Sequence, residues 1–401
     1  MPISSPYYVY ILRCSDDTLY TGITTDLERR LDEHNHSPKG AKYTRNRRPV
    51  ALVYSEPCSN KSAASKREYA IKQLKRSQKE ELLLRRVFTM EPMLQVSRWL
   101  ETQLQQCSAD AEIAFEVVDP DHGAASYAGK QISVEGIEYL YRGYKAWSDL
   151  AELHFCRMLT PKAAEGGRVL MRFQRLDTAS SFHSSENGEK TEKYGTASAF
   201  SSINKNEEPA FLLAYKRALE AVKIASKQRI LNLGVNTGDE FALIRDMTAA
   251  EEFEAMELVG IDHSASAIEA ARTRFASSNV SFHVHDINHL DALELGRFDL
   301  LISIGTLQSP GIDFKPLFMS LVQEYLVKNE GAMILGFPNC RWIDGEMVYG
   351  AKAPNYSYSE LSLLMKDLYF CKKYLQQKRY RVTITGKDYL FLTATPIRKP
   401  A

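Results

Sequence analysis

Residues 7–23 have the sequence YYVYILRCSDDTLYTGI, and this stretch decides the fold of the first part of the chain. Two segments rich in aromatic and β-branched residues, Tyr7–Leu12 and Leu19–Ile23, flank the polar segment Ser15–Thr18. Apolar runs of this composition favour strands, and a short polar segment between two of them is typical of a turn. The pattern therefore predicts a β-hairpin near the start of the chain.

A helix is predicted directly after this hairpin. Asp26 precedes an amphipathic run and is a residue type that caps helices, so we expect the helix to begin there. Arg30 and His34 are four positions apart, which places both side chains on one face. A third strand is predicted over Val50–Ser55 and one long helix over Ser62–Leu84, which gives the order ββαβα. The long helix carries Glu68 and is expected to direct Ala64, Tyr69, Ile71 and Leu74 inward.

These elements and side chains resemble the GIY-YIG nuclease domain, in the compact form found as small stand-alone bacterial proteins. Tyr8-Val9-Tyr10 stands where that family has its first triplet, and Tyr20-Thr21-Gly22 stands where it has the second. The first glycine and the isoleucines of the triplets are replaced here, while the polar side chains are present. The resemblance implies five site residues, namely the active-site tyrosines Tyr10 and Tyr20, the phosphate-binding Arg30, the helix histidine His34 and the metal ligand Glu68.

The implied chemistry is metal-dependent hydrolysis of a phosphodiester. A single carboxylate such as Glu68 suits Mg²⁺, which keeps most of its waters and accepts phosphate oxygens as ligands. The planar guanidinium of Arg30 would offset the charge that develops on the phosphoryl oxygens. One of the two tyrosines would act as the general base, and the sequence leaves open which one. Each residue taken alone could be an ordinary strand or helix residue, but their order and spacing favour a site.

The charge distribution favours a polyanionic partner. Residues 1–86 contain 17 Lys and Arg against 10 Asp and Glu, a net charge of +7, whereas the whole chain is at +1. A basic surface of this kind suits a nucleic acid, either DNA or RNA, although a run of charges is often only a solvated face. The basic residues that we expect to follow a phosphate backbone are Lys39, Lys42, Arg45, Arg47, Arg48, Lys72, Lys75, Arg76 and Lys79.

The length of 401 residues is sufficient for two or three domains, each with a core of its own. No apolar run reaches the roughly 18 to 20 residues that a membrane helix requires, and the chain has no signal-peptide pattern at its start. We therefore expect a cytoplasmic protein without a membrane partner. The six cysteines form no CxxC pair or His/Cys cluster, which is typical of reduced thiols rather than a zinc site.

Three regions are predicted. Residues 1–86 form the GIY-YIG-like domain, residues 87–190 a small α/β intermediate region with a linker, and residues 191–401 a third domain. The intermediate region shows no catalytic motif. Its predicted elements are helices over Leu94–Gln105 and Lys145–Phe155 and strands over Ile113–Val118, Ile132–Val134, Tyr139–Tyr141 and Val169–Phe173.

The third region has the alternating pattern of a doubly wound sheet. A strand over Arg229–Leu233 ends in a glycine-containing turn, Gly234–Gly238, which opens a helix. Such a turn lets the backbone approach a ligand closely. About twenty residues later the strand Leu258–Ile261 ends at Asp262, where a carboxylate can bind ribose hydroxyls. Further strands are predicted over Val280–Val284, Phe298–Ile304 and Ala332–Phe337.

The end of the chain decides between two cofactor classes. The strands Tyr380–Thr385 and Tyr389–Thr395 are joined by a tight turn, so the sheet should end in an antiparallel hairpin. This ending resembles a class I S-adenosylmethionine-dependent methyltransferase rather than a nicotinamide dehydrogenase. The resemblance implies Asn232, Gly234, Asn236 and Gly238 on the methionine side of the cofactor, Asp262 at the ribose, Asp286 near the adenine, and Ser303 to Leu307 beside the methyl group.

Two departures from that family concern the cofactor. The usual acidic residue at the tip of the first strand is Asn232, and a loop glycine is Asn236, which affects recognition of the cofactor's amino group. A third departure concerns the acceptor, because Ser303–Gln308 stands where methyltransferases of base amines have an Asn/Asp-Pro-Pro-aromatic motif. That segment is closer to methyltransferases of small molecules or modified side chains.

The sequence thus predicts an α/β multidomain protein that joins a GIY-YIG nuclease-like domain to a Rossmann-like methyltransferase domain. We expect S-adenosylmethionine and Mg²⁺, or another divalent cation, as cofactors, and nucleic acid as the shared substrate. Two alternatives remain open. The first domain could bind nucleic acid without cleaving it and deliver it to the methyltransferase, or the methyltransferase could act on a small molecule.

Overall fold

The computed structural model describes residues 7–83, 86–122, 127–180, 195–350 and 361–397. The chain forms two compact units, residues 1–177 and residues 178–401, which are described separately below. The linker predicted before residue 190 falls mainly outside the described ranges, and the division of the chain into three regions stays a prediction.

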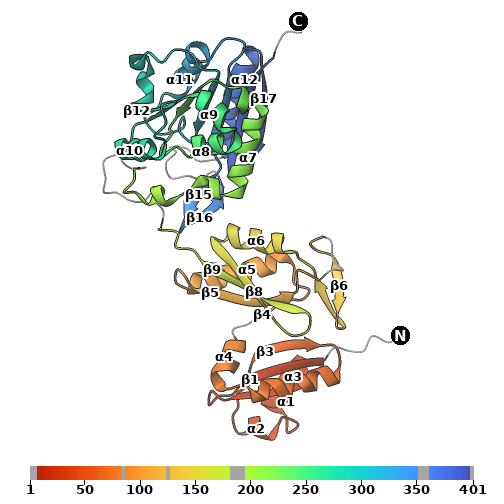
Figure 1. The fold of residues 1–401 in the computed structure, drawn as a ribbon. Helices are drawn as coiled ribbons and strands as arrows, with labels where there is room; N and C mark the ends of the chain where they lie inside the picture. The colour runs from red at the N-terminus through yellow and green to blue at the C-terminus, as the bar shows by residue number, and fades with distance from the viewer. Residues whose placement is uncertain (1–6, 84–85, 123–126, 181–194, 351–360, 398–401) are drawn as a thin grey trace. The chain divides into compact units, whose positions relative to one another are not determined.

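The first unit begins with a three-stranded antiparallel sheet in the order β2-β1-β3 (Figure 1). The predicted hairpin is confirmed, and so is the cap of the first helix, where the Asp26 side chain accepts a hydrogen bond from the Arg29 amide. The elements are β1 (Tyr7–Arg13), β2 (Leu19–Thr24), α1 (Leu27–His36), α2 (Lys42–Arg45), β3 (Ala51–Cys58), α3 (Lys61–Gln73) and α4 (Arg76–Leu83).

The single long helix predicted after β3 is wrong. The backbone leaves the helical region at Leu74, whose ψ of 142° is extended, and the side chain of Gln78 then accepts a hydrogen bond from the Lys75 amide. Two helices, α3 and α4, result.

The inward direction predicted for Tyr69 is also wrong, since this residue is 68% exposed. Tyr69 precedes the buried Ile71 by two positions, about 200° around a helix, and so lies on the opposite side.

The second part of this unit packs two helices against a four-stranded sheet in the order β4-β5-β9-β8. Phe115 of β5 is at the centre of its core, in ring contact with Trp147 and Phe173. The strand β8 was not predicted from the sequence. It contains Pro161, which it tolerates because it is an edge strand with a register shift there. The elements are β4 (Arg86–Val87), α5 (Met93–Gln106), β5 (Glu112–Val118), β6 (Gln131–Val134), β7 (Ile137–Leu140), α6 (Tyr144–Leu153), β8 (Cys156–Ala163) and β9 (Arg168–Arg175).

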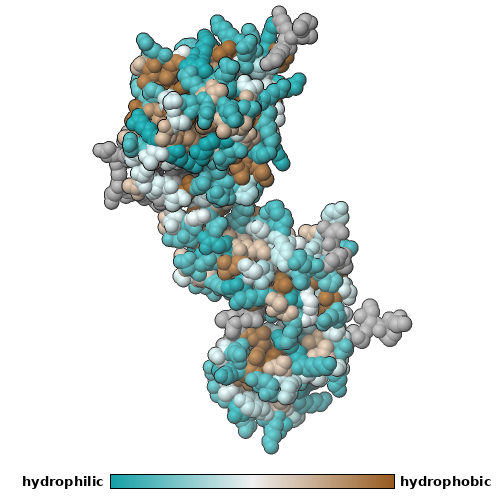
Figure 2. All heavy atoms as spheres, viewed as in Figure 1, coloured by the Kyte–Doolittle hydropathy of each residue, from teal (hydrophilic) through white to brown (hydrophobic). Residues whose placement is uncertain are grey.

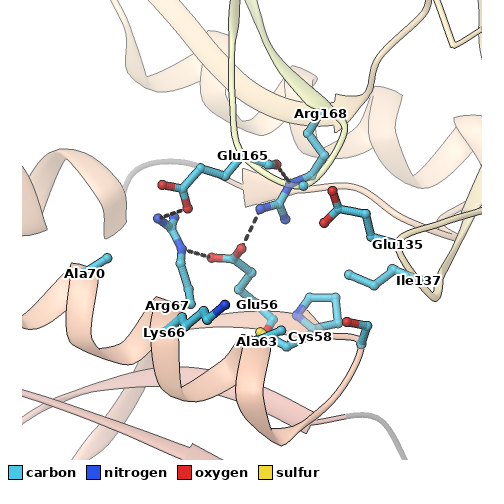
Figure 3. Close-up of a pocket in the computed structure, with 13 residues that line it drawn as sticks. Glu56, Cys58, Ala63, Lys66, Arg67, Ala70, Glu135, Ile137, Glu165 and Arg168 are labelled. Carbon is cyan, nitrogen blue, oxygen red and sulfur yellow. Dashed lines mark hydrogen bonds and ion pairs between the residues drawn. The ribbon is translucent and has the colours of Figure 1, made fainter.

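Buried ion pairs join the two parts of the first unit (Figure 3). Glu56 of β3 accepts a hydrogen bond from Arg168 of β9 at 2.5 Å and another from Arg67 of α3 at 2.9 Å. Glu56 and Arg168 are 3% and 4% exposed. Burial by itself would raise the pKa of Glu56, but the two guanidinium groups outweigh it and hold that pKa below its ordinary value. These groups border a cavity of about 270 Å³, into which Lys66 and Glu135 also project.

The second unit is built on a seven-stranded sheet in the order β12-β11-β10-β13-β14-β18-β17. The first five strands are parallel, and β18 and β17 are antiparallel to their neighbours, which confirms the predicted fold class. The strands are β10 (Arg229–Leu233), β11 (Glu257–Asp262), β12 (Val280–Val284), β13 (Leu300–Ile304), β14 (Ala332–Pro338), β17 (Tyr380–Gly386) and β18 (Tyr389–Pro396), with a separate hairpin of β15 (Cys340–Ile343) and β16 (Glu346–Tyr349).

Helices cover both faces of this sheet. One core contains Tyr215 and Phe241 from two of the helices, and the core on the other face contains Phe318 and Leu368. The helices are α7 (Pro209–Ala221), α8 (Asp239–Met247), α9 (Ala250–Ala255), α10 (Ala265–Arg274), α11 (Phe314–Ser320) and α12 (Leu361–Gln377), with 3-10 turns at Ala199–Ser202, Lys205–Glu207, Ile224–Ser226 and Ile287–Leu293 and a π-helical turn at Leu321–Tyr325.

Among the described helices, none has the length and apolar character needed to span a membrane. On the face shown in Figure 2, hydrophilic side chains cover most of the surface of each unit. All six cysteines are free thiols.

The buried ion pairs generate a stability prediction. In the full chain, Arg168→Met should lower the free energy of unfolding of the first unit by about 3 to 5 kcal/mol, because Glu56 would remain buried without its main counter-charge. Native-state hydrogen exchange of peptides from β3 and β9 measures this change. The control is Glu165→Gln, which removes an exposed partner of Arg67 and should cost at most about 1 kcal/mol. Equal losses in the two variants would contradict the prediction.

Candidate active sites

The first candidate site lies where β1, β2 and α1 meet. Tyr10 of β1 is paired with Gly22 of β2 in the antiparallel register, and its ring lies against that glycine. A Cβ atom at position 22 would be 2.7 Å from the Tyr10 hydroxyl oxygen. A side chain at position 22 would clash with Tyr10, so the triplet Tyr20-Thr21-Gly22 must end in glycine. This packing holds the Tyr10 hydroxyl next to the helix that carries Arg30 and His34.

A chain of hydrogen bonds determines the protonation of His34. The Thr44 hydroxyl donates to the Ala41 carbonyl oxygen at 3.0 Å, so its oxygen is the acceptor towards His34 Nδ1, 2.7 Å away. His34 Nδ1 must then carry the proton, which leaves Nε2 as an acceptor. The Tyr10 hydroxyl lies 2.8 Å from Nε2 and donates to it. Thr44 was not predicted as a site residue, because nothing in its local sequence distinguishes it from other threonines.

Arg30 completes this arrangement from the other side. Its Nε donates to the Tyr10 hydroxyl oxygen at 3.3 Å, while its Nη1 pairs with Glu33 at 2.6 Å. The Tyr10 hydroxyl therefore gives its proton towards an imidazole nitrogen and receives a hydrogen bond from a guanidinium. These contacts distinguish Tyr10 from Tyr20 as the tyrosine arranged for proton transfer.

Burial keeps both Tyr10 and His34 neutral. Burial raises the pKa of Tyr10 to about 12; the Arg30 hydrogen bond lowers this pKa, and the charges on Tyr20 and Glu68 raise it. Burial lowers the pKa of His34 to about 4, and the charges of Arg30 and Arg48 add to that effect. At neutral pH the proton therefore stays on the Tyr10 oxygen and the imidazole is uncharged.

The other two predicted residues lie beside this chain. The Tyr20 ring is 6.3 Å from that of Tyr10 and 5.1 Å from that of His34, centroid to centroid. The Glu68 carboxylate pairs with Lys72 at 2.6 Å, and its charge acts on the Tyr10 hydroxyl. The structure thus joins Tyr10, Arg30 and His34 by hydrogen bonds and Tyr20 by ring contacts, and it brings Glu68 within electrostatic range.

The donor set fits a magnesium ion only with water as the main ligand. In the described ranges no three His, Cys, Asp or Glu side chains gather as a metal cluster, so Glu68 is not part of such a group. Mg²⁺ is commonly held by one or two carboxylates, with waters and phosphate oxygens in the remaining positions. Glu68 therefore suits a site that the phosphate of a substrate completes.

Several of the basic residues expected to follow a phosphate backbone are engaged within the unit. Arg48 donates to the His34 and Ser37 carbonyl oxygens, both at 2.6 Å. Arg47 pairs with Asp16 and stacks on the exposed Tyr43 ring, 4.2 Å from its centroid. These arginines stabilise the segment around α2.

The second candidate site lies along the edge of the large sheet where the parallel strands end. Three loop residues predicted to face the cofactor have left-handed backbone, with φ of 75° at Gly234, 46° at Asn236 and 88° at Gly238. Asp262 at the end of β11 fixes this loop, since its carboxylate accepts the Asn236 amide at 3.0 Å and the Ser264 amide at 2.9 Å. Asp262 Oδ1 also lies 3.5 Å from His263 Nδ1.

The remaining predicted residues lie along the same edge. Asp286 follows β12 and caps the next turn through the Asn288 amide, at 2.9 Å. Ser303 of β13 is buried and donates to the Leu233 carbonyl oxygen at 3.3 Å. Asn232 of β10 is fully buried, and its Oδ1 atom has no hydrogen-bond partner. An unpaired buried acceptor beside a left-handed loop fits a ligand that brings a hydrogen-bond donor, as S-adenosylmethionine would.

The neutral imidazole generates a pH prediction. The pKa of His34 in the folded chain lies near 4, below the ordinary value of 6.5, so the unfolded chain binds more protons between these pH values. The free energy of unfolding should therefore rise with pH from 4 to 6.5 and lose the His34 contribution as the pH falls. NMR of ¹³C-histidine in the full chain, with His34→Gln for assignment and exposed His36 for comparison, measures the titration. A His34 midpoint near 6.5 would contradict the prediction.

Known proteins are similar to each of the two parts. Residues 6–81 match the GIY-YIG catalytic domain family, and residues 224–380 match a methyltransferase domain family. A UPF0213 protein of Desulfotalea psychrophila is 62% identical over 77 residues, which covers 19% of this chain and 70% of the relative. A UPF0213 protein of Natronomonas pharaonis is 53% identical over 81 residues, which covers 20% of this chain and 94% of the relative.

Solved methyltransferase structures are similar to the second unit at a lower level. The plantazolicin methyltransferase BpumL in complex with SAH is 16% identical, with a TM-score of 0.36, and the similarity covers 49% of this chain and 89% of that one. A similarity of this size carries no argument about activity. The sequence families are decisive: the chain belongs to the GIY-YIG family together with the UPF0213 proteins, and it carries an S-adenosylmethionine-dependent methyltransferase domain in its second unit.

Proposed function

We propose that this chain is a bifunctional enzyme of nucleic acids, which hydrolyses phosphodiesters with its GIY-YIG domain and transfers methyl groups with its methyltransferase domain. The observation that carries the first activity is the hydrogen-bonded chain from Thr44 through His34 and Tyr10 to Arg30. A buried chain of this kind orders a phenol, an imidazole and a guanidinium at one point, which a binding surface does not require.

The geometry supports a specific role in phosphodiester hydrolysis for each of these side chains. The Tyr10 oxygen would take a proton from the attacking water while its own proton passes to His34 Nε2, across the existing 2.8 Å hydrogen bond. Arg30 would hold the phosphoryl oxygens as negative charge develops on them. Glu68 would hold the divalent cation, which supplies positive charge at the phosphate. That charge is needed because, without it, the proton strongly prefers Tyr10 over His34.

Methyl transfer depends mainly on position, since the acceptor must approach the sulfonium methyl in line. Asp262 would bind the ribose hydroxyls of S-adenosylmethionine, the Gly234–Gly238 loop would cover its methionine part, and Asp286 would lie near the adenine. We propose nucleic acid, either DNA or RNA, as the acceptor, because the net charge of +7 on residues 1–86 suits a polyanion.

One observation favours a second candidate function. Glu68 is paired with Lys72, and no group of three or more His, Cys, Asp or Glu side chains that could hold a metal lies in the described parts of the chain, which is a sparse donor set. The GIY-YIG domain would then be a nucleic-acid-binding module without cleavage, and the methyltransferase would modify the bound RNA or a small molecule. The two candidates differ in whether Mg²⁺ is required.

The nuclease proposal predicts a loss of cleavage without a loss of binding. With Mg²⁺, the full chain should cut single-stranded or branched nucleic acid, and Glu68→Gln and Tyr10→Phe should each slow cutting by about 100-fold or more. Gel cleavage assays give the rates, and fluorescence anisotropy gives the affinity. Glu28→Gln, the same charge change at an exposed position of α1, is the control. Cutting by Glu68→Gln at the wild-type rate, or no cutting by wild type under any divalent cation, would reject the proposal.

The cofactor assignment predicts that Asp262→Ala weakens S-adenosylmethionine binding at least 10-fold, about 1.4 kcal/mol, because ribose contacts and loop order are lost together. Isothermal titration calorimetry measures the affinity. Asp246→Ala, an exposed aspartate of α8, should leave it unchanged. An unchanged affinity in Asp262→Ala would remove this residue from the site. Mass spectrometry of nucleosides from cells with and without the protein then identifies the methyl acceptor.

A further inference from the structure

An exposed aromatic ring lies directly beside the first candidate site. α2 is a single helical turn in which Thr44 is buried against His34, whereas the preceding residue, Tyr43, is 42% exposed. Successive residues of a helix point about 100° apart, so the contact that places Thr44 inside leaves Tyr43 outside. The Tyr43 ring is stacked on that of Tyr20, with centroids 6.1 Å apart and planes at 25°. Since Tyr20 also contacts Tyr10 and His34, the exposed ring is one ring contact away from them.

Arg47 holds the Tyr43 ring in place. Its guanidinium carbon lies 4.2 Å from the ring centroid, and its Nη1 donates to the Tyr43 carbonyl oxygen at 2.8 Å. Its Nε donates to Asp16 at 2.9 Å, which fixes the guanidinium from the other side. Stacked rings with centroids as far apart as those of Tyr43 and Tyr20 are offset and overlap only in part. A large part of the Tyr43 ring therefore stays open to a ligand although two side chains contact it.

Positive charge lies along the path from Arg30 to this ring. Arg30 Nη1 donates to the Lys39 carbonyl oxygen at 3.3 Å, and Lys42 directly precedes Tyr43. Both lysines are exposed, and within the described ranges neither of them pairs with a carboxylate. Ammonium groups of this kind are available to the phosphates of a strand that runs past the ring. The ligand that fits this surface combines an aromatic plane with negative charge.

An unpaired nucleotide has both properties. Its base can leave the stack of a strand and lie on a tyrosine ring, and such stacking does not depend on which base is present. The bases of a duplex are stacked on one another and offer no free face to a side chain at the protein surface. An aromatic platform beside a phosphate-binding arginine thus distinguishes single-stranded from paired nucleic acid.

We propose that Tyr43 is a stacking platform for an unpaired base, next to the phosphate that Arg30 and Tyr10 would bind. Tyr43 contacts the base, and Arg47 keeps the ring in position. This inference rests on the proposed action on nucleic acid and names unpaired strands as the substrate class of the first site.

The test measures binding without cleavage, by fluorescence anisotropy of the full chain in EDTA. Tyr43→Leu removes the aromatic face and should weaken binding of an oligodeoxythymidylate at least about 5-fold, while binding of a fully paired duplex changes less than about 2-fold. Tyr69→Leu is the control, because it makes the same change at an exposed position of α3, and it should leave both affinities as they are in the wild type.

An oligomer of abasic residues separates a lost contact from a folding defect. Removal of the bases should weaken binding to the wild type, and this loss should be at least about 5-fold smaller in Tyr43→Leu, because the platform has nothing left to lose. Tyr43→Trp presents a larger aromatic face and should bind the oligodeoxythymidylate at least as tightly as the wild type. An oligouridylate of equal length gives the same comparison for RNA, and the platform requires the Tyr43 effect with one of the two strands.

Three results would overturn the inference. They are equal losses in Tyr43→Leu for single strand and duplex, equal losses for base-bearing and abasic oligomers, and weaker binding by Tyr43→Trp than by Tyr43→Leu. If the wild-type chain binds none of the strands, the proposed action on nucleic acid fails as well. If the wild type binds and cuts single strands but Tyr43→Leu binds them equally well, only the platform fails.

Discussion

The hydrogen bond from the Tyr10 hydroxyl to His34 Nε2 is the contact on which the first candidate site depends. It connects β1 to α1, and the hydrogen bond from His34 Nδ1 to the Thr44 hydroxyl connects α1 to α2. The bond needs space as well as partners, because any side chain larger than hydrogen at Gly22 would meet the Tyr10 ring. A polar chain buried this deeply is stable only when each member is satisfied. Fold and site are therefore specified by the same residues.

The sequence predicted the parts of this site that follow local rules. The four-residue spacing of Arg30 and His34 places them on one helix face, and the hairpin pattern brings Tyr10 and Tyr20 beside each other. Thr44 could not be predicted, because its role depends on how α2 folds back onto α1. The break at Leu74 was also missed, since a competing hydrogen bond from Lys75 to Gln78 ends the helix without glycine or proline.

The second unit was more predictable for a topological reason. In a parallel sheet, every strand delivers its carboxyl end to the same edge, so the positions of Asp262, Asp286 and Ser303 follow from the strand order alone. The hydrogen-bond partners of these side chains cannot be predicted from the strand order. The sequence marked Asn232 as a departure, but only the packing of α8 against β10 reveals that its Nδ2 atom lies 3.3 Å from the Glu240 carboxyl group.

The two candidate sites differ in whether their buried polar groups have hydrogen-bond partners within the protein, and this difference fits the reaction proposed for each. In the first, Thr44, His34, Tyr10 and Arg30 satisfy one another, so the groups that we propose to act on a phosphate are ordered before a substrate arrives. Preorganised groups of this kind cost no reorganisation at the moment of reaction. In the second, Asn232 Oδ1 is left open and can be satisfied by a bound molecule. A donor brought there by a bound cofactor would add to the affinity for it, which suits a site where the reactive group belongs to the cofactor.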